Sequence, residues 1–146
     1  MPDDAGNAVI RLVVQSDACS VRAALQDLFG TVGIARLPEP DRGTAEIVLA
    51  EVLNNIVEHA QARKAGEIEV LLSHTPQGLA CTVIDRGQRM PGGRLPEGLP
   101  TGLSIDTGNL PEGGFGWQLI RLLATDLAYR RDGDRNELSF RLLAGQ

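Results

Sequence analysis

Apolar residues between Arg42 and Arg63 recur every three or four positions, which is the spacing of one long helix. At about 100° of rotation per residue, these positions form one stripe that faces away from Glu51. The stripe consists of Ala45, Leu49, Ala50, Val52, Leu53, Ile56, Val57 and Ala60. Glu51, Asn55 and His59 follow one another at four-residue intervals and share the opposite face. We therefore predict a helix that buries one side, while its polar side either meets water or forms a site.

Shorter patterns on both sides of this helix predict five strands and two further helices. Alternation of apolar and polar residues, or a short apolar run, predicts strands at Val9–Val14, Glu67–Ser73, Leu79–Ile84, Asp126–Arg131 and Glu137–Leu143. Helical spacing predicts helices at Ala18–Phe29 and Phe115–Ala124. In the first of these, the apolar residues expected to face inward are Leu25, Leu28 and Phe29.

The order of these elements predicts the architecture. Turn residues at Thr75–Gly78 and Asp132–Asp134 join the second and third strands, and the last two strands, as hairpins. We see no internal repeat and expect a single domain over residues 1–146. The expected fold class is α/β (α+β), a two-layer sandwich in which helices cover one face of a mixed β-sheet.

The segment from Gly87 to Gly114 differs from the rest of the chain in composition. It is rich in glycine, contains four prolines and has little hydrophobic periodicity. A loop of this length inside a compact domain is usually functional or disordered. We predict that it is a lid over a ligand site.

Composition excludes several classes of function. The formal net charge of the 146 residues is −5 and they contain no basic cluster, which argues against nucleic acid as a direct partner. No apolar run approaches the roughly 20 residues that a membrane-spanning helix needs, and we expect no membrane association. Cys19 and Cys81 lack the spacing of a zinc or redox motif, so we expect reduced core thiols in a cytoplasmic protein.

Lys64 is the only lysine in the chain. A P-loop and a protein-kinase-type active site each need a lysine on the phosphates within a defined motif. Lys64 stands in Arg-Lys-Ala-Gly, which is neither motif. If the chain binds a nucleotide, it does so by another design.

Two short motifs flank the predicted lid. Asp85 and Gly87 end a strand, where a carboxylate can accept a hydrogen bond from the amino group of adenine and glycine leaves room for a flat ring. The same motif is also ordinary turn chemistry at a strand end. Gly114 and Gly116 open the last helix, where free N–H groups and the helix dipole favour an anion such as phosphate. A simple hinge into the helix would use the same glycines.

The order of the motifs resembles the ATP site of the GHKL superfamily, which includes the gyrase, histidine-kinase and MutL ATPases. A Glu-x3-Asn-x3-His-Ala helix comes first, then a hairpin ending in Asp-x-Gly, then a glycine-rich lid ending in Gly-x-Gly at a helix. The resemblance extends from about Val9 to Leu143 and is greatest to the stand-alone anti-sigma-factor serine kinases of the RsbW and SpoIIAB type. It implies a Bergerat-type ATP-binding fold with an ATP lid at about 87–114. Phe115 and Trp117 are bulkier than the residues that the family more often has there.

The resemblance also implies roles for the residues on the polar face of the long helix. Asn55 would coordinate Mg²⁺ through its amide oxygen. Glu51 would be the general base that acts on the attacking hydroxyl group. His59 matches the motif and would support the nucleotide site, or it would be a solvent-exposed helix residue.

The motifs at the two ends of the lid would bind the nucleotide itself. By the resemblance, Asp85 would recognise adenine and Gly87 would make room for the base. Gly114 and Gly116 would donate backbone N–H groups to the phosphates. The cofactors implied are ATP and Mg²⁺.

The function that the resemblance implies is an ATP-dependent serine/threonine protein kinase that acts as an anti-sigma factor. Its partners would be a STAS-domain anti-anti-sigma protein, which it phosphorylates, and a sigma factor, which it binds, in a partner-switching pathway. The family also suggests a homodimer. Two alternatives stay open at this point: a non-catalytic ATP-binding regulatory switch, and a detached histidine-kinase-like catalytic domain.

Overall fold

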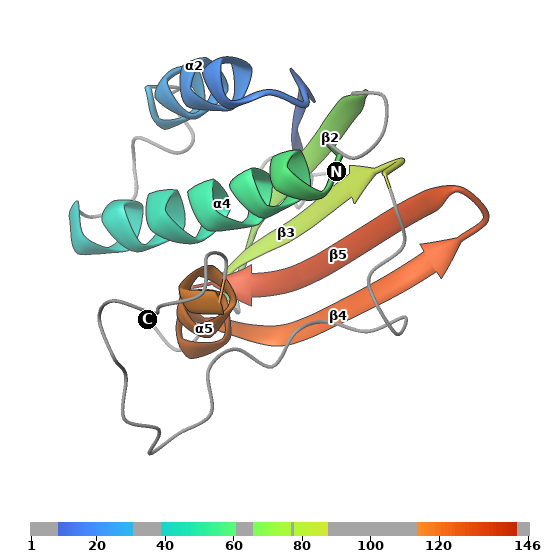
Figure 1. The fold of residues 1–146 in the computed structure, drawn as a ribbon. Coiled ribbons are helices and arrows are strands. Elements are labelled where there is room, and N and C mark those ends of the chain that lie inside the picture. Colours follow the sequence, from blue (N-terminus) through green and yellow to red (C-terminus); the bar gives the residue numbers. More distant parts are fainter. Residues whose placement is uncertain (1–8, 31–38, 61–65, 77, 88–113, 143–146) are drawn as a thin grey trace, which may run out of the picture.

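The computed structural model describes residues 9–30, 39–60, 66–76, 78–87 and 114–142, apart from the side chains of residues 39, 40, 59, 60, 114 and 115. Within these ranges the elements follow one another as shown in Figure 1: β1 (Val9–Gln15), α2 (Ala18–Phe29), α4 (Glu39–Ala60), β2 (Glu67–Thr75), β3 (Gly78–Asp85), α5 (Gly114–Leu123), β4 (Ala124–Asp132) and β5 (Arg135–Leu142). Every strand and helix expected from the sequence is present.

The five strands form one sheet in the order β1-β2-β3-β5-β4, and every neighbouring pair is antiparallel. The expectation of a mixed sheet is therefore wrong. Helices α2 and α4 lie between β1 and β2 in the chain. The start of β2 nevertheless lies beside the end of β1, where Gln15 pairs with Glu67. Strands β3 and β4 do run in the same direction, but β5 lies between them and pairs antiparallel with both.

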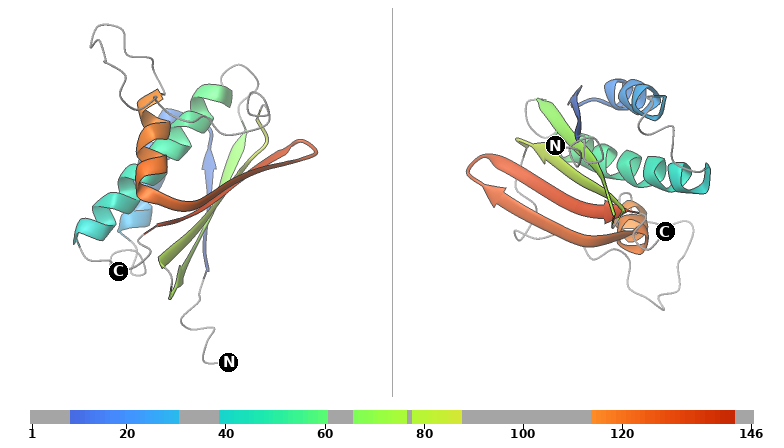
Figure 2. Two further views of the ribbon diagram at one scale, coloured as in Figure 1. Left: turned by 90° about the horizontal axis from the view of Figure 1, so that it is seen from below. Right: turned by 180° about the vertical axis from the view of Figure 1, so that it is seen from behind.

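The three helices lie on one face of the sheet, which confirms the predicted two-layer arrangement (Figure 2). Helix α4 packs into the core through Ala45, Leu49, Val52, Leu53, Ile56 and Val57 of the predicted stripe, and through Val48 beside them. The sheet contributes alternate residues, such as Ile68, Val70 and Leu72 of β2, as the two-residue period of a half-buried strand requires. None of the described helices is long and apolar enough to cross a membrane.

The start of α4 lies three residues earlier than expected, at Glu39 instead of Arg42. A proline in the interior of a helix removes a backbone hydrogen bond. Pro40 instead occupies the first turn of the helix, where a backbone N–H has no partner to lose.

Helix α2 has the predicted bounds and begins with a side-chain cap. The Asp17 carboxylate accepts a hydrogen bond from the Ser20 backbone N–H at 2.7 Å and from the Ser20 hydroxyl at 2.9 Å. These two bonds lower the pKa of Asp17. Leu25 and Leu28 are buried as expected, and Phe29 is partly buried against the core.

The two cysteines have different environments. Cys81 is buried in β3, and its burial raises the pKa of its thiol. Cys19 was expected in the core but is exposed, because it lies on the face of α2 opposite the buried Val21, Leu25 and Leu28.

Candidate functional site

The first turn of α5 packs directly against the polar side of α4. Gly116 is buried there, and a Cβ atom added to it would stand 2.5 Å from Glu51 Oε1 and 3.2 Å from Asn55 Nδ2. The first of these separations is too short for non-bonded atoms, so the position accepts glycine alone without a shift of Glu51. The missing side chain brings the N-terminal turn of α5, whose N–H groups have no partner within the helix, against a carboxylate and an amide.

The two polar side chains of α4 differ in exposure. Asn55 is buried, with 6% of its surface exposed, whereas its neighbour Asn54 is exposed. Asn55 Nδ2 has no hydrogen-bond partner among the described residues, which is costly for a buried amide. Glu51 is half-buried. We call Glu51, Asn55 and the first turn of α5 the phosphate end of the site, because this is the place where an anion would meet the helix terminus.

Asp85 lies at the end of β3, where the strand register places it opposite Asn136 of β5. Its Oδ1 atom accepts a hydrogen bond from the Gly87 backbone N–H at 2.7 Å and from Asn136 Nδ2 at 3.0 Å. Neither bond uses Oδ2, which accepts no hydrogen bond from the described residues. The carboxylate is therefore held through one oxygen while the other is available as an acceptor.

Asn136 connects Asp85 to the β4–β5 hairpin. Its Oδ1 atom accepts hydrogen bonds from the Tyr129 hydroxyl at 2.6 Å and from Arg131 Nη1 at 3.1 Å. Arg131 Nη1 also donates to the Gly87 carbonyl oxygen at 2.9 Å. We call Asp85, Gly87 and this group of side chains the base end of the site.

The sequence reasoning missed Asn136, Tyr129 and Arg131. The sequence did contain a signal for Asn136. It is a polar residue at the first of four alternate positions that face inward, and the other three are Leu138, Phe140 and Leu142. It is buried, with 6% of its surface exposed. Tyr129 and Arg131 had no such signal, because their roles depend on how β4 pairs with β5.

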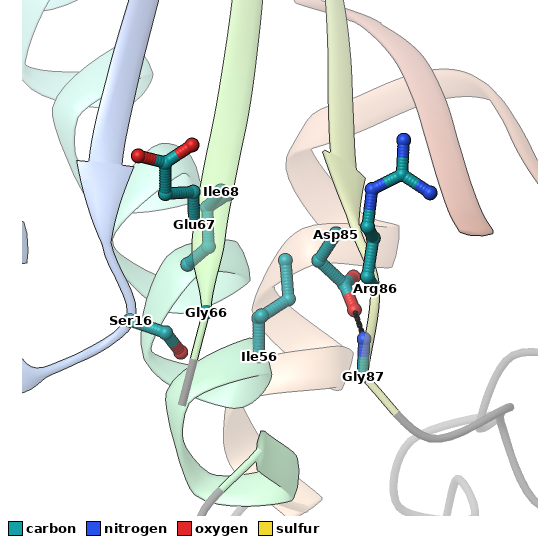
Figure 3. A pocket seen from close by; sticks show the side chains of 8 residues that line it. All are labelled: Ser16, Ile56, Gly66, Glu67, Ile68, Asp85, Arg86 and Gly87. Atoms are coloured by element: carbon teal, nitrogen blue, oxygen red, sulfur yellow. Dashed lines mark hydrogen bonds between the residues drawn. The ribbon is translucent and has the colours of Figure 1, made fainter. Parts of the chain in front are cut away.

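A shallow hollow, open to solvent, lies beside the base end. It is lined by Ser16, Ile56, Gly66, Glu67, Ile68, Asp85, Arg86 and Gly87 (Figure 3). Ile56 directly follows Asn55 on α4, so the hollow and the phosphate end share one helix. Arg86 turns its guanidinium away from the Asp85 carboxylate, toward an exposed ion pair with Asp134 at 2.9 Å.

The geometry agrees with the comparison with known families. A family model described as histidine kinase-like ATPase domain matches residues 14–142, a segment that contains both ends of the site. The chain belongs to this family. A search of curated proteins found no match.

Membership in the histidine kinase-like ATPase family confirms the predicted GHKL superfamily, and with it the ATP-binding fold. It implies that the domain binds ATP. It does not select the RsbW and SpoIIAB type among the members, so that finer resemblance stays a prediction. The roles of the individual residues stay predictions as well.

Two predicted features of this ATPase domain fall outside the described residues. The lid is one: Gly87 follows β3 and Gly114 is the first residue of α5, but residues 88–113 between them are not described. The other is the side chain of His59, whose backbone belongs to α4.

Proposed function

We propose that this histidine kinase-like ATPase domain is an ATP-dependent serine/threonine protein kinase that acts as an anti-sigma factor. Its substrate is a STAS-domain anti-anti-sigma protein, and a sigma factor is its second partner. The observation that supports catalysis best is the half-buried carboxylate of Glu51, beside Asn55 and against the first turn of α5. A carboxylate repels phosphate, so mere binding of ATP gives no reason for one at this place, whereas proton transfer does.

The two ends of the site suggest how the nucleotide is oriented. In our proposal adenine occupies the hollow, where Asp85 accepts a hydrogen bond from its amino group and Gly87 leaves room for the ring. The phosphates extend along α4 past Asn55 to the first turn of α5. Gly114 and Gly116 present backbone N–H groups there, and the positive end of the helix dipole favours the negative charge.

The residues at the phosphate end fit Mg²⁺. Among the described residues no group of three His, Cys, Asp or Glu side chains encloses a metal site. Mg²⁺ does not need one, since it commonly binds through one or two protein oxygens together with phosphates and waters. The buried amide of Asn55 offers such an oxygen, and its unpaired Nδ2 could donate a hydrogen bond to a phosphate oxygen. When bound, the ion would neutralise phosphate charge close to Glu51.

The chemical role that we assign to this chain is the transfer of one proton. Glu51 accepts the proton of a serine or threonine hydroxyl on the substrate. The hydroxyl oxygen forms a bond to the γ-phosphorus while the bond from that phosphorus to the β–γ bridging oxygen breaks, which releases ADP. A positioned general base contributes roughly 10²–10⁴ in rate. This function places the protein in the cytoplasm, with a homodimer as a further expectation.

The test is transfer of label from γ-labelled ATP to STAS-domain proteins encoded in the same genome. We expect acid-stable label on a serine or threonine of one of them, which disappears with Glu51→Gln. Label that is acid-labile and base-stable would instead indicate the histidine-kinase-like alternative. Binding of ATP without transfer to any STAS protein would overturn the kinase proposal and favour the non-catalytic switch.

A further inference from the structure

Ser16 lines the same hollow as Asp85, and the two residues lie on either side of β2 (Figure 3). It lies in the short connection between β1 and α2, and its backbone N–H donates to the Gly66 carbonyl oxygen at 2.8 Å. Only 6% of the residue is exposed. Figure 3 shows its hydroxyl group directed into the hollow.

The hydroxyl of Ser16 has no hydrogen-bond partner among the described residues. A buried hydroxyl in that condition destabilises the fold unless a ligand or a water satisfies it. The residue is nevertheless held firmly, because its backbone is tied to Gly66 and the next residue, Asp17, caps α2. The fold therefore positions a polar group and leaves its hydrogen bond to be made by something in the hollow.

The chemistry of the two polar groups matches one edge of adenine. The carboxylate of Asp85 can only accept hydrogen bonds, whereas the hydroxyl of Ser16 can donate one. Adenine presents an amino donor beside the ring nitrogen N1, which is an acceptor. Guanine presents the reverse order, with a carbonyl oxygen beside a protonated N1, and would oppose both groups.

We propose that Ser16 is a second adenine-recognising residue, whose hydroxyl donates to N1 directly or through one bound water. This inference rests on the proposed position of adenine in the hollow. It does not depend on whether the domain transfers phosphate.

The test compares nucleotide binding by the wild type and Ser16→Ala in calorimetry. Ser139→Ala is the matched control, because Ser139 is a half-buried serine of β5 that does not line the hollow. We expect Ser16→Ala to weaken binding of ATP and of 7-deaza-ATP about three- to tenfold. Binding of 1-deaza-ATP, which lacks the N1 acceptor, should be the same for the wild type and the variant.

A second measurement separates binding from folding. Without nucleotide, the melting temperature of Ser16→Ala should equal or exceed that of the wild type, since the lost hydroxyl has no partner in the described part of the fold. Unchanged ATP affinity in Ser16→Ala would overturn the proposal. Equal weakening for all three nucleotides would overturn it too, because the serine would then act only through the shape of the hollow.

The outcome for Asp85→Asn shows which idea has failed. If Asp85→Asn weakens ATP binding and Ser16→Ala does not, adenine lies in the hollow and only the role of Ser16 is wrong. If neither variant changes ATP binding, the proposed position of the base is wrong as well.

Discussion

The two ends of the site are built in opposite ways. At the base end, side chains satisfy one another: Asp85, Asn136 and the Gly87 carbonyl oxygen all have hydrogen-bond partners. At the phosphate end, Asn55 Nδ2 has none among the described residues, and Gly116 contributes by having no side chain. The base end is therefore organised without a ligand, whereas the phosphate end leaves a polar group that a ligand could satisfy.

This difference has an energetic consequence. A preorganised group loses little conformational entropy when it binds, so the base end can provide specificity at low cost. An incompletely satisfied amide beside a carboxylate gains most when an ion and phosphates arrive, so the phosphate end can couple binding to catalysis. Substitutions should accordingly affect recognition and stability at the base end, and chemistry at the phosphate end.

The largest effect is expected at Glu51. Glu51→Ala should lower single-turnover phosphotransfer about 10²–10⁴-fold while ATP affinity stays near the wild-type value, because the nucleotide does not need the proton acceptor. Asn55→Ala should weaken Mg·ATP binding and transfer together. Glu46→Ala is the control, since Glu46 is an exposed carboxylate elsewhere on α4. Transfer by Glu51→Ala at the wild-type rate would remove the general base from the proposal.

Gly116→Ala tests whether the phosphate end depends on a missing side chain. The added methyl group would displace the Glu51 carboxylate, which is the end of a flexible side chain, so we expect phosphotransfer at least tenfold slower with little loss in the free energy of unfolding. The matched control is Gly43→Ala in α4, where nothing lies within 4 Å of the new atom. That variant should gain about 0.4–1 kcal/mol. Single-turnover transfer and urea unfolding provide the measurements, and transfer by Gly116→Ala as fast as by Gly43→Ala would contradict the close contact.

Asn136→Ala should show the cost of breaking the base end. It removes partners from Asp85, Tyr129 and Arg131 together, and we expect a loss of about 1–3 kcal/mol in the free energy of unfolding and weaker discrimination between ATP and GTP. Tyr129→Phe removes a single donor and should cost about 0.5–1.5 kcal/mol. Urea unfolding and competition binding provide the measurements. Unchanged selectivity in Asn136→Ala would mean that Asp85 needs no support from β5.

The smallest effect is expected at Asp17, which belongs to neither end. Its pKa is lowered in the folded state, so its contribution is complete well above the ordinary value of 3.8 and is lost as the pH falls through the lower folded pKa. Asp17→Asn keeps a capping oxygen but does not titrate in this range. The melting temperature of the wild type should therefore exceed that of the variant near neutral pH and approach it in acid. A constant difference at every pH would exclude Asp17 as the source.

The phosphate end was largely predictable from the sequence, and the base end was not. The helix period placed Glu51 and Asn55 on one face, and Gly116 belonged to a motif of adjacent residues. Asn55, four residues after Glu51, is buried, whereas its neighbour Asn54 is exposed. For the base end only Asp85 and Gly87 were found, because their supporting residues come from strands that are distant in the chain.

The sequence by itself determined the elements, their amphipathic faces and the order of the nucleotide motifs, because these depend on residues within a few positions of each other. Only the tertiary structure decided that β5 lies between β3 and β4, and so that Asn136 stands beside Asp85. It likewise brought Ser16 and Asp85 to one hollow. Strand order and register arise from the joint packing of the sheet against α2, α4 and α5. They therefore cannot be predicted from local patterns in the sequence.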